Sequence, residues 1–173
     1  MPQAVTHVLL TIILVGFYRD YVTKHKHYFS LYTVLIAGFA GLFPDIDVPL
    51  NWIFKVYGYI FPLWQHGGIT HTPTFALIFL VPGLLFLKKG KHKMAMYFFV
   101  MSFGISFHLF LDWLLGGGGH SGIMFLWPFS HTGWRIGLLT KAGLDSVPQA
   151  LDAIILLSWL FYIEKKHKIS DFV

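Results

Sequence analysis

Five long apolar runs, separated by short charged or glycine-rich segments, constrain the fold of this chain more than any other feature. Hydrophobic residues make up 55% of the sequence and charged residues only 12%, whereas soluble domains carry about a quarter charged residues. The sequence therefore predicts one all-α domain over residues 1–173, a polytopic integral membrane helical bundle. The predicted spans are Val5–Tyr18, Tyr28–Phe43, Pro73–Leu87, Met94–Leu115 and Pro148–Ile163.

The lengths and flanks of these runs refine the prediction. Several are shorter than the ~20 residues of a full crossing, which helix tilt or local thinning of the bilayer accommodates. The first run has no basic flank before it and no small-residue cleavage site after it, so we expect a first span and not a removed signal peptide. Asn51–Trp64 is aromatic and contains Gly58 and Pro62, which favours an interfacial or re-entrant segment.

The distribution of basic residues predicts an orientation. Ten of the 13 lie in the loops after the first and third runs and after the last run. By the positive-inside rule this side is cytoplasmic. We therefore expect a multi-pass protein of the cytoplasmic membrane, with its N-terminus outside the cell and its C-terminus in the cytoplasm. The net charge of +5 then faces anionic lipid and requires no nucleic-acid partner. The absence of cysteine excludes disulfides, thiolate metal sites and cysteine nucleophiles.

Seven polar residues share an unusual location in this topology. Each falls in the outer half or near the outer end of an apolar run, where a polar group without a partner is costly. We predict that they converge near one depth as ligands of a metal centre. They are His7, Asp45, Asp47, His66, His71, His108 and Asp112.

Two pairs within this set have informative spacing. His108 and Asp112 are four residues apart and share one face of a helix, although a private hydrogen-bonded pair or a proton relay is the alternative. Asp45 and Asp47 would point the same way in an extended segment, with a solvated turn as the alternative. His7 taken alone could be a hydrogen-bonded histidine at a helix end.

The segment His66–Pro73 is expected to be a turn that leads into a helix. Thr72 is the predicted N-cap and Pro73 the first helical residue. The positive end of this helix favours the neutral, metal-binding form of His71, and a simple loop histidine is the alternative. Thr72 and the helix start could also hold an anionic phosphate of the substrate.

Further candidates lie on the outer side. Arg135 is a candidate anion-binding residue, with a lipid-headgroup anchor as the alternative. His120 and His131, in a glycine-rich region, could reach the site and contact substrate. The loop from Gly116 to Gly122 has the flexibility of a lid. The remaining histidines lie among lysines on the cytoplasmic side, where we expect them to be solvated; they are His25, His27, His92 and His167.

Four histidines and three aspartates without a thiolate suit zinc, with manganese or iron as alternatives, better than calcium or magnesium. Seven ligands exceed one tetrahedral zinc and fit a site of two divalent ions with open positions for water and substrate. Such ions acidify bound water, and Asp45 or Asp47 could be the base that deprotonates it. A serine triad is not supported, because Ser106 and His108 face different sides of a helix.

The same residues, in the same order, resemble the YdjM-like predicted membrane-bound metal-dependent hydrolases. The matching motifs are Thr6-His7, Pro44-Asp45-Ile46-Asp47, His66-Gly67-Gly68-Ile69-Thr70-His71, His108 through Asp112, and Leu126-Trp127-Pro128. The resemblance covers nearly the whole chain. It implies a distant relation to zinc-dependent phospholipase C, with a bi- or trinuclear metal centre and phosphoester hydrolysis. Gly67 departs from the pattern, because arginine is typical there, and Arg135 could replace that arginine.

The expected function is therefore an integral membrane metal-dependent hydrolase that cleaves a phosphoester of a lipid headgroup on the extracytoplasmic side. The alternative is a metal-ion or proton transporter that uses the same cluster. A transport path would continue toward the cytoplasm, where the inner halves of the predicted spans offer no histidine or acidic residue apart from Glu164. A third interpretation is a structural protein whose metal staples the bundle, but it leaves the excess of ligands unexplained.

Overall fold

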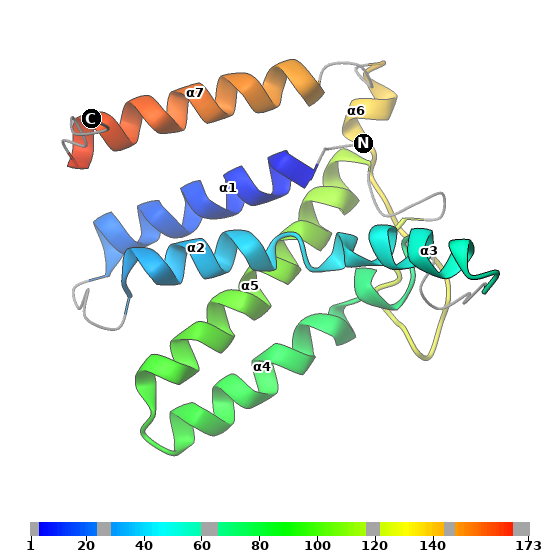
Figure 1. Cartoon of the computed structure of the whole chain (residues 1–173), viewed down its shortest axis with the longest axis horizontal. Coiled ribbons are helices and arrows are strands. Elements are labelled where there is room, and N and C mark those ends of the chain that lie inside the picture. The colour runs from blue at the N-terminus through cyan, green and yellow to red at the C-terminus, as the bar shows by residue number, and fades with distance from the viewer. Residues whose placement is uncertain (1–3, 24–28, 60–65, 117–121, 144–147, 168–173) are drawn as a thin grey trace.

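The computed structural model describes residues 4–23, 29–59, 66–116, 122–143 and 148–167 (Figure 1). Helices dominate these residues, and the one β pairing among them is an isolated bridge between Ile123 and Trp134. The predicted all-α class is confirmed for the described part of the chain.

Most helices follow the predicted apolar runs closely. α1 (Ala4–Phe17) continues into a π-helical turn, η1 (Tyr18–Val22). Pro73 occupies the first turn of α4 (Pro73–Lys88), as expected from its fixed φ angle. α5 (His92–Leu115) ends at Gly116, whose φ of 117° lies in the left-handed region that glycine adopts readily. The shorter α6 (Leu138–Lys141) precedes α7 (Pro148–His167).

The connection between the second run and the third differs from the prediction. α2 (Leu31–Ala40) is followed by a 3₁₀ turn, η2 (Pro44–Ile46), which leads directly into α3 (Asp47–Val56). The expected extended segment at residues 45–47 was wrong, because Pro44 starts a helical turn, where its missing N–H is not needed. The predicted segment Asn51–Trp64 begins inside α3, and its residues 60–64 lie outside the described residues.

Fewer helices reach the length of a membrane span than the five predicted. Among the described residues, Ala4–Val22 and His92–Leu115 are long and apolar enough to cross a membrane. α2 and Pro44–Val56 qualify together as a third, but they are bent by 49°. The apolar helices Pro73–Lys88 and Asp152–Ile163 are shorter. At a rise of about 1.5 Å per residue, neither matches the ~30 Å of a bilayer core without tilt or thinning.

α5 is the helix around which the others are arranged. It contacts α1, α2 and α4, while α1 also contacts α2 and α7 (Figure 1). Apolar side chains of α1, α2 and α5, together with Phe29 just before α2, form the main buried cluster. Its members are Ile12, Val15, Phe29, Val34, Ala37 and Val100.

Two glycines allow α1, α2 and α5 to approach closely at one level. A Cβ atom on Gly104 would lie 2.5 Å from the carbonyl oxygen of Ala37. A Cβ atom on Gly41 would lie 3.2 Å from the carbonyl oxygen of His7. Gly104 therefore needs a residue without a side chain, whereas a side chain at Gly41 would require its neighbours to shift by a few tenths of an ångström. The close approach brings His7 and His108, one turn after Gly104, to the same level of the bundle.

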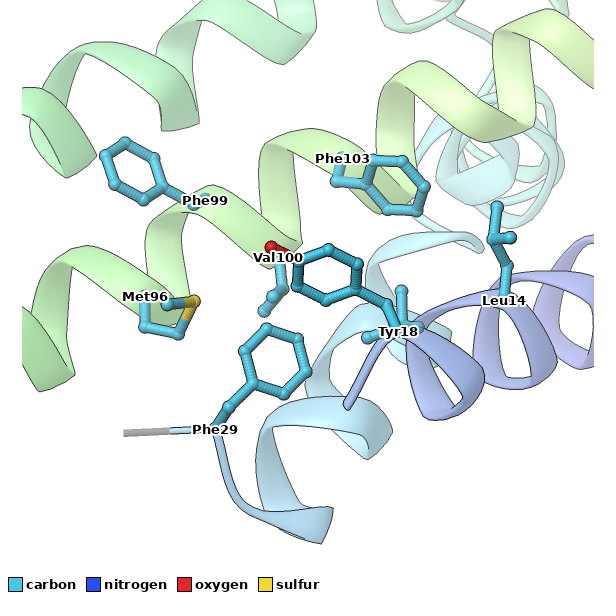
Figure 2. Close-up of a pocket in the computed structure, with 8 residues that line it drawn as sticks. Leu14, Tyr18, Phe29, Met96, Phe99, Val100 and Phe103 are labelled. Carbon is cyan, nitrogen blue, oxygen red and sulfur yellow. The ribbon is translucent and has the colours of Figure 1, made fainter. Parts of the chain in front are cut away.

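A cavity of about 380 Å³ between α1 and α5 is lined by apolar and aromatic side chains, including Leu14, Tyr18, Phe29 and Phe103 (Figure 2). Within the described part of the chain, no histidine or carboxylate lines it. This cavity is therefore separate from the polar cluster described next.

Candidate metal centre

The first group of potential ligands joins α1 to α5. Nε2 of His7 lies 3.3 Å from one carboxylate oxygen of Asp112, and Nε2 of His108 lies 3.2 Å from the other. The two imidazole rings are stacked, with centroids 3.8 Å apart. All three side chains are buried. One potential ligand atom from each of the three residues lies within 4.8 Å of the other two, close enough for all three to bind a single metal ion.

The second group comes from the α2–α3 connection and from the segment before α4. Asp45 follows Pro44 in η2, His71 ends a 3₁₀ turn, η4 (Ile69–His71), and His66 precedes that turn. Nε2 of His71 lies 3.6 Å from a carboxylate oxygen of Asp45. Asp45, His66 and His71 also have donor atoms close enough together to hold one metal ion.

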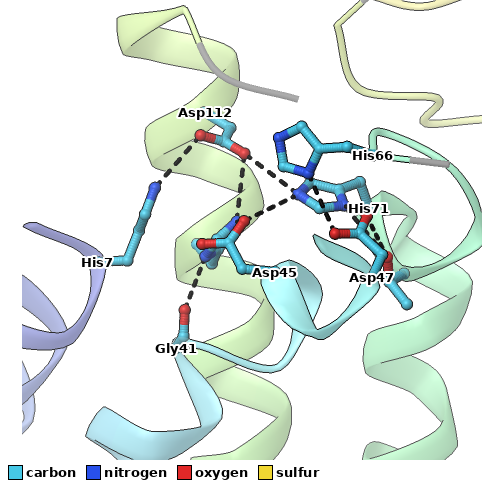
Figure 3. Close-up of polar contacts among 9 residues, drawn as sticks. His7, Gly41, Asp45, Asp47, His66, His71 and Asp112 are labelled. Carbon is cyan, nitrogen blue, oxygen red and sulfur yellow. Dashed lines mark hydrogen bonds and ion pairs between the residues drawn. The ribbon is translucent and has the colours of Figure 1, made fainter. Parts of the chain in front are cut away.

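The two groups form one continuous cluster (Figure 3). The carboxylate of Asp45 lies 3.7 Å from Nε2 of His108, and the carboxylate of Asp112 lies 3.7 Å from Nε2 of His71. Each of these aspartates thus faces a histidine of the other group. Two carboxylates placed between two sets of imidazoles are an arrangement suited to a pair of neighbouring metal ions.

The hydrogen bonds of the imidazoles indicate which nitrogen faces the cluster. Nδ1 of His108 donates to the carbonyl oxygen of Gly41 at 2.7 Å, so the neutral ring carries its lone pair on Nε2. Nε2 of His71 and Nε2 of His108 are both buried without a hydrogen-bond partner among the described residues. Buried polar atoms are seldom left unsatisfied. Both Nε2 atoms lie beside carboxylates without forming hydrogen bonds within the cluster. This arrangement fits metal ligation and argues against a simple hydrogen-bonded histidine–aspartate pair.

Asp47 belongs to the cluster but lies behind the histidines. Its carboxylate is 3.1 Å from Nδ1 of His66 and 3.2 Å from Nδ1 of His71, and it accepts a hydrogen bond from the Thr70 hydroxyl (Figure 3). It is fully buried and is not a member of either three-residue group. Carboxylates in this position orient metal-binding imidazoles and raise their basicity.

The charge of the cluster also calls for a cation. In the described residues, the ion-pair contacts of Asp45, Asp47 and Asp112 are all with histidines, and neither lysine nor arginine is among them. Three carboxylates this close repel one another unless positive charge is present. In the metal-free protein a protonated His71 supplies part of that charge, and bound metal ions would supply more of it.

The protonation of His71 corrects one expectation. Burial lowers the pKa of His71, but the carboxylates of Asp45 and Asp47 outweigh burial and raise it to about 9. The expected neutral imidazole was therefore wrong for the metal-free protein, because two adjacent carboxylates act more strongly than a helix end. A metal ion at Nε2 has to displace this proton.

The described residues that were predicted to bind substrate, Thr72 and Arg135, are not joined to the metal-ligand cluster by a hydrogen bond or ion pair. Thr72 is the N-cap residue of α4, but its buried hydroxyl donates to the carbonyl oxygen of Ile69 and does not cap the helix. Arg135 is exposed, and no ion pair within the described residues joins it to the cluster. His120 and most of the predicted lid, residues 117–121, lie outside the described residues.

The backbone conformation at residue 67 favours glycine. Its φ angle is 85°, in the region that side-chain-bearing residues rarely adopt. Replacement of the typical arginine by glycine is thus compatible with the turn that positions His66.

The exposed His131 lies outside both ligand groups.

Asp152 is a buried acidic residue that was not predicted from the sequence. This residue lies in α7 and is buried, its carboxylate accepts a hydrogen bond from the Thr6 hydroxyl, and Oδ2 has no hydrogen-bond partner among the described residues. Thr6 precedes the candidate ligand His7, so the contact ties α7 to the part of α1 that carries this ligand. An acidic residue inside an apolar run was the signal that could have identified it.

A mainly helical fold in the described residues, with helices long and apolar enough to cross a membrane and a buried histidine–aspartate cluster, defines a class: helical membrane proteins with a candidate metal centre. Within that class, the chain belongs to the YdjM inner membrane protein family, because the model of that family matches residues 1–168. The resemblance drawn from the five motifs is therefore confirmed at the level of the family. No curated protein and no solved structure shows a significant match to the chain.

Proposed function

We propose that this protein is an integral membrane metal-dependent hydrolase that cleaves a phosphoester of a lipid headgroup at the extracytoplasmic side. The observation that carries the proposal is the pair of unsatisfied Nε2 atoms on His71 and His108, buried beside the carboxylates of Asp45 and Asp112. This donor set suits zinc, and manganese and iron are the alternatives.

Each ligand group would hold one of two ions. His7, His108 and Asp112 form the first group, and Asp45, His66 and His71 form the second. The ions supply Lewis-acid activation of water and of the phosphoryl oxygens. The chain itself supplies orientation, because the Gly41 carbonyl fixes the ring of His108 and Asp47 fixes that of His71.

Asp45 is the proposed general base. Its side chain is 24% exposed, whereas that of Asp47 is fully buried and occupied by His66 and His71. A base has to reach the attacking water, which favours Asp45 over Asp47. Water then adds to phosphorus, the P–O bond to the leaving alcohol breaks, and the proton accepted by Asp45 returns to that alcohol.

The anionic phosphate needs positive charge besides the metal ions. The start of α4 presents the positive end of the helix dipole, but Pro73 has no backbone N–H, and the N–H of Phe75 donates to the carbonyl oxygen of Thr72. Because the Thr72 hydroxyl also donates, to Ile69, the dipole is what this helix start would contribute to binding the anion. Arg135 is exposed and available to contact the headgroup.

The proposed topology has five crossings with the N-terminus outside. The lysine-rich loops lie at the ends of α4 and α7 that are remote in sequence from the ligands. Under the positive-inside rule the cluster then belongs to the outer half of the membrane. Tilt or local thinning would let the shorter α4 and α7 cross.

The experiment is a hydrolysis assay with zinc-loaded protein in detergent and in lipid nanodiscs. A panel of phospholipids with different headgroups is incubated, and diacylglycerol and released headgroup are measured by mass spectrometry. We expect release with the wild type and with His131→Ala, and loss of release with Asp112→Asn. If metal is bound but no lipid is cleaved, while metal ions cross liposome membranes in a protein-dependent manner, the transporter is correct instead.

A further inference from the structure

A second cavity, which we name the α2–α3 groove, opens beside the cluster. It has a volume of about 620 Å³ and is lined by residues of α2, η2 and α3, together with Ala4 and His66. Its volume lies within the roughly 300–1,000 Å³ of typical small-molecule sites. Two lining residues, Asp45 and His66, belong to the second ligand group, and the others are apolar.

The groove also contains the accessible members of the cluster. The side chains of Asp45 and His66 are 24% and 30% exposed, whereas those of His71 and His108 are fully buried. A substrate can therefore contact the cluster through the groove without displacing the buried histidines.

The apolar part of the groove faces the surroundings of the bundle. Phe39, Ile46 and Val48 are 66%, 45% and 52% exposed. In a membrane, exposed apolar side chains on a helix meet lipid chains. A molecule in the groove would thus have an apolar part against α2 and α3 and a polar part at Asp45 and His66.

We propose that the α2–α3 groove seats the alkyl chain of the amphiphile whose phosphoryl headgroup lies at the metal cluster. This inference rests on the proposed function and specifies its substrate class. The substrate is an amphiphilic phosphoester that enters from the bilayer along α2 and α3, and water-soluble phosphoesters without a chain are poor substrates.

The other cavities do not offer this combination. The described residues that line the cavity between α1 and α5 include no histidine and no carboxylate. A cavity of about 540 Å³ near Trp113 and Trp134 is lined by aromatic and aliphatic residues with Ser106, again without a ligand of either group. Among these three cavities, the α2–α3 groove alone joins an apolar wall to the candidate ligands.

The test uses a long-chain alkylphosphonate that carries a photoreactive diazirine at the end of its chain. Its carbon–phosphorus bond resists hydrolysis, so labelling is independent of turnover. The zinc-loaded protein in nanodiscs is irradiated, and labelled peptides are identified by mass spectrometry. We expect labelling concentrated on the peptides that contain Phe39–Pro49, and competition by an alkylphosphonate without the diazirine.

Two valines of equal exposure provide a matched pair of variants. Val48 lines the groove and Val81 lies on α4 away from it, and each is 52% exposed. Val48→Trp should fill the groove and lower labelling at least fivefold, because each methylene excluded from an apolar site costs about fourfold in binding. Val81→Trp should leave labelling unchanged. Removal of zinc with a chelator should also lower labelling in the groove.

The outcomes separate the groove from the hydrolytic activity. Labelling spread evenly over the lipid-facing helices, or unaffected by Val48→Trp or by zinc removal, overturns the groove even if lipids are hydrolysed. Zinc-dependent labelling of the groove without hydrolysis of any lipid supports the groove and contradicts the proposed function.

Discussion

Nδ1 of His108 donates a 2.7 Å hydrogen bond to the backbone carbonyl oxygen of Gly41. A carbonyl oxygen can only accept, so the neutral imidazole carries its lone pair on Nε2, the atom that faces Asp112. The contact depends on the close approach of α5 to α2. The backbone of one helix thereby sets the tautomer of a candidate ligand on another.

The first prediction concerns Gly104, which permits this approach. Gly104→Ala places a Cβ atom 2.5 Å from the carbonyl oxygen of Ala37, so α5 has to move away from Gly41. We expect a loss of about 1–3 kcal/mol in unfolding free energy from overpacking, together with reduced zinc content. Thermal unfolding in detergent and metal analysis of the purified variant measure both effects.

Gly16→Ala is the matched control for this substitution. A Cβ atom on Gly16 would lie 3.9 Å from a methyl group of Val34, which is ordinary contact. Alanine is also about 0.5–1 kcal/mol better than glycine inside a helix, so this variant should be as stable as the wild type or more so. Equal behaviour of the two variants would mean that the helix approach at Gly104 is not tight.

The second prediction separates a ligand from an orienting carboxylate. Asp47→Asn keeps the shape of the side chain but removes the charge beside Nδ1 of His66 and His71. Loss of such a partner weakens metal binding about 10–100-fold, so excess zinc should restore occupancy. Asp112→Asn removes a direct ligand, and occupancy should stay low in excess zinc. Competition with a chromophoric chelator measures both affinities, and identical affinities for the two variants contradict this division of roles.

The third prediction concerns pH. Since the pKa of His71 is raised to about 9, this imidazole is protonated in the metal-free protein at neutral pH and must release its proton when zinc binds. Zinc affinity should therefore rise with pH, by about tenfold per unit from this one group, and level off above about pH 9. Calorimetric titrations in buffers of different ionisation enthalpy count the released protons. Binding without proton release near neutral pH would show that His71 is not a ligand.

The fourth prediction concerns the buried contact between Thr6 and Asp152. Thr6→Val removes the hydroxyl that donates to the Asp152 carboxylate and leaves a buried acidic group without this partner. We expect a loss of about 1–3 kcal/mol in unfolding free energy. Asp152→Leu combined with Thr6→Val should recover most of that loss, because both polar groups are then absent. Additive effects in this double-mutant cycle would show that the contact contributes nothing.

Local patterns in the sequence predicted the parts of the site that depend on one helix. The spacing of His108 and Asp112 places both on one face of α5, and Pro73 marks the start of α4. The role of Asp47 could not be predicted in this way. Pro44 is compatible with an extended turn and with the first turn of a helix, and the choice depends on packing between α2, α3 and the segment before α4. Because the segment is helical, the Asp47 carboxylate lies against Nδ1 of His71. In an extended segment it would instead point the same way as the Asp45 carboxylate.

The number of membrane spans could not be predicted from local sequence patterns either. Hydrophobicity identifies an apolar helix, but whether a helix as short as α4 crosses the bilayer depends on tilt and on neighbouring helices. Asp152 was missed for a related reason. An acidic residue in an apolar run is a signal of a buried polar group, but near the start of the run it is equally compatible with a solvated helix end. The structure decides between the two, because Asp152 is buried and in contact with Thr6.

The central claim is that the cluster binds two metal ions. Its most direct test is the metal content of the protein, purified in detergent without added metal and measured by inductively coupled plasma mass spectrometry against quantitative amino-acid analysis. We expect about two equivalents of a transition metal per chain in the wild type, unchanged content in His131→Ala, and a clear loss in Asp112→Asn. Wild-type protein without bound metal even after incubation with zinc, or Asp112→Asn with the content of the wild type, would contradict the account.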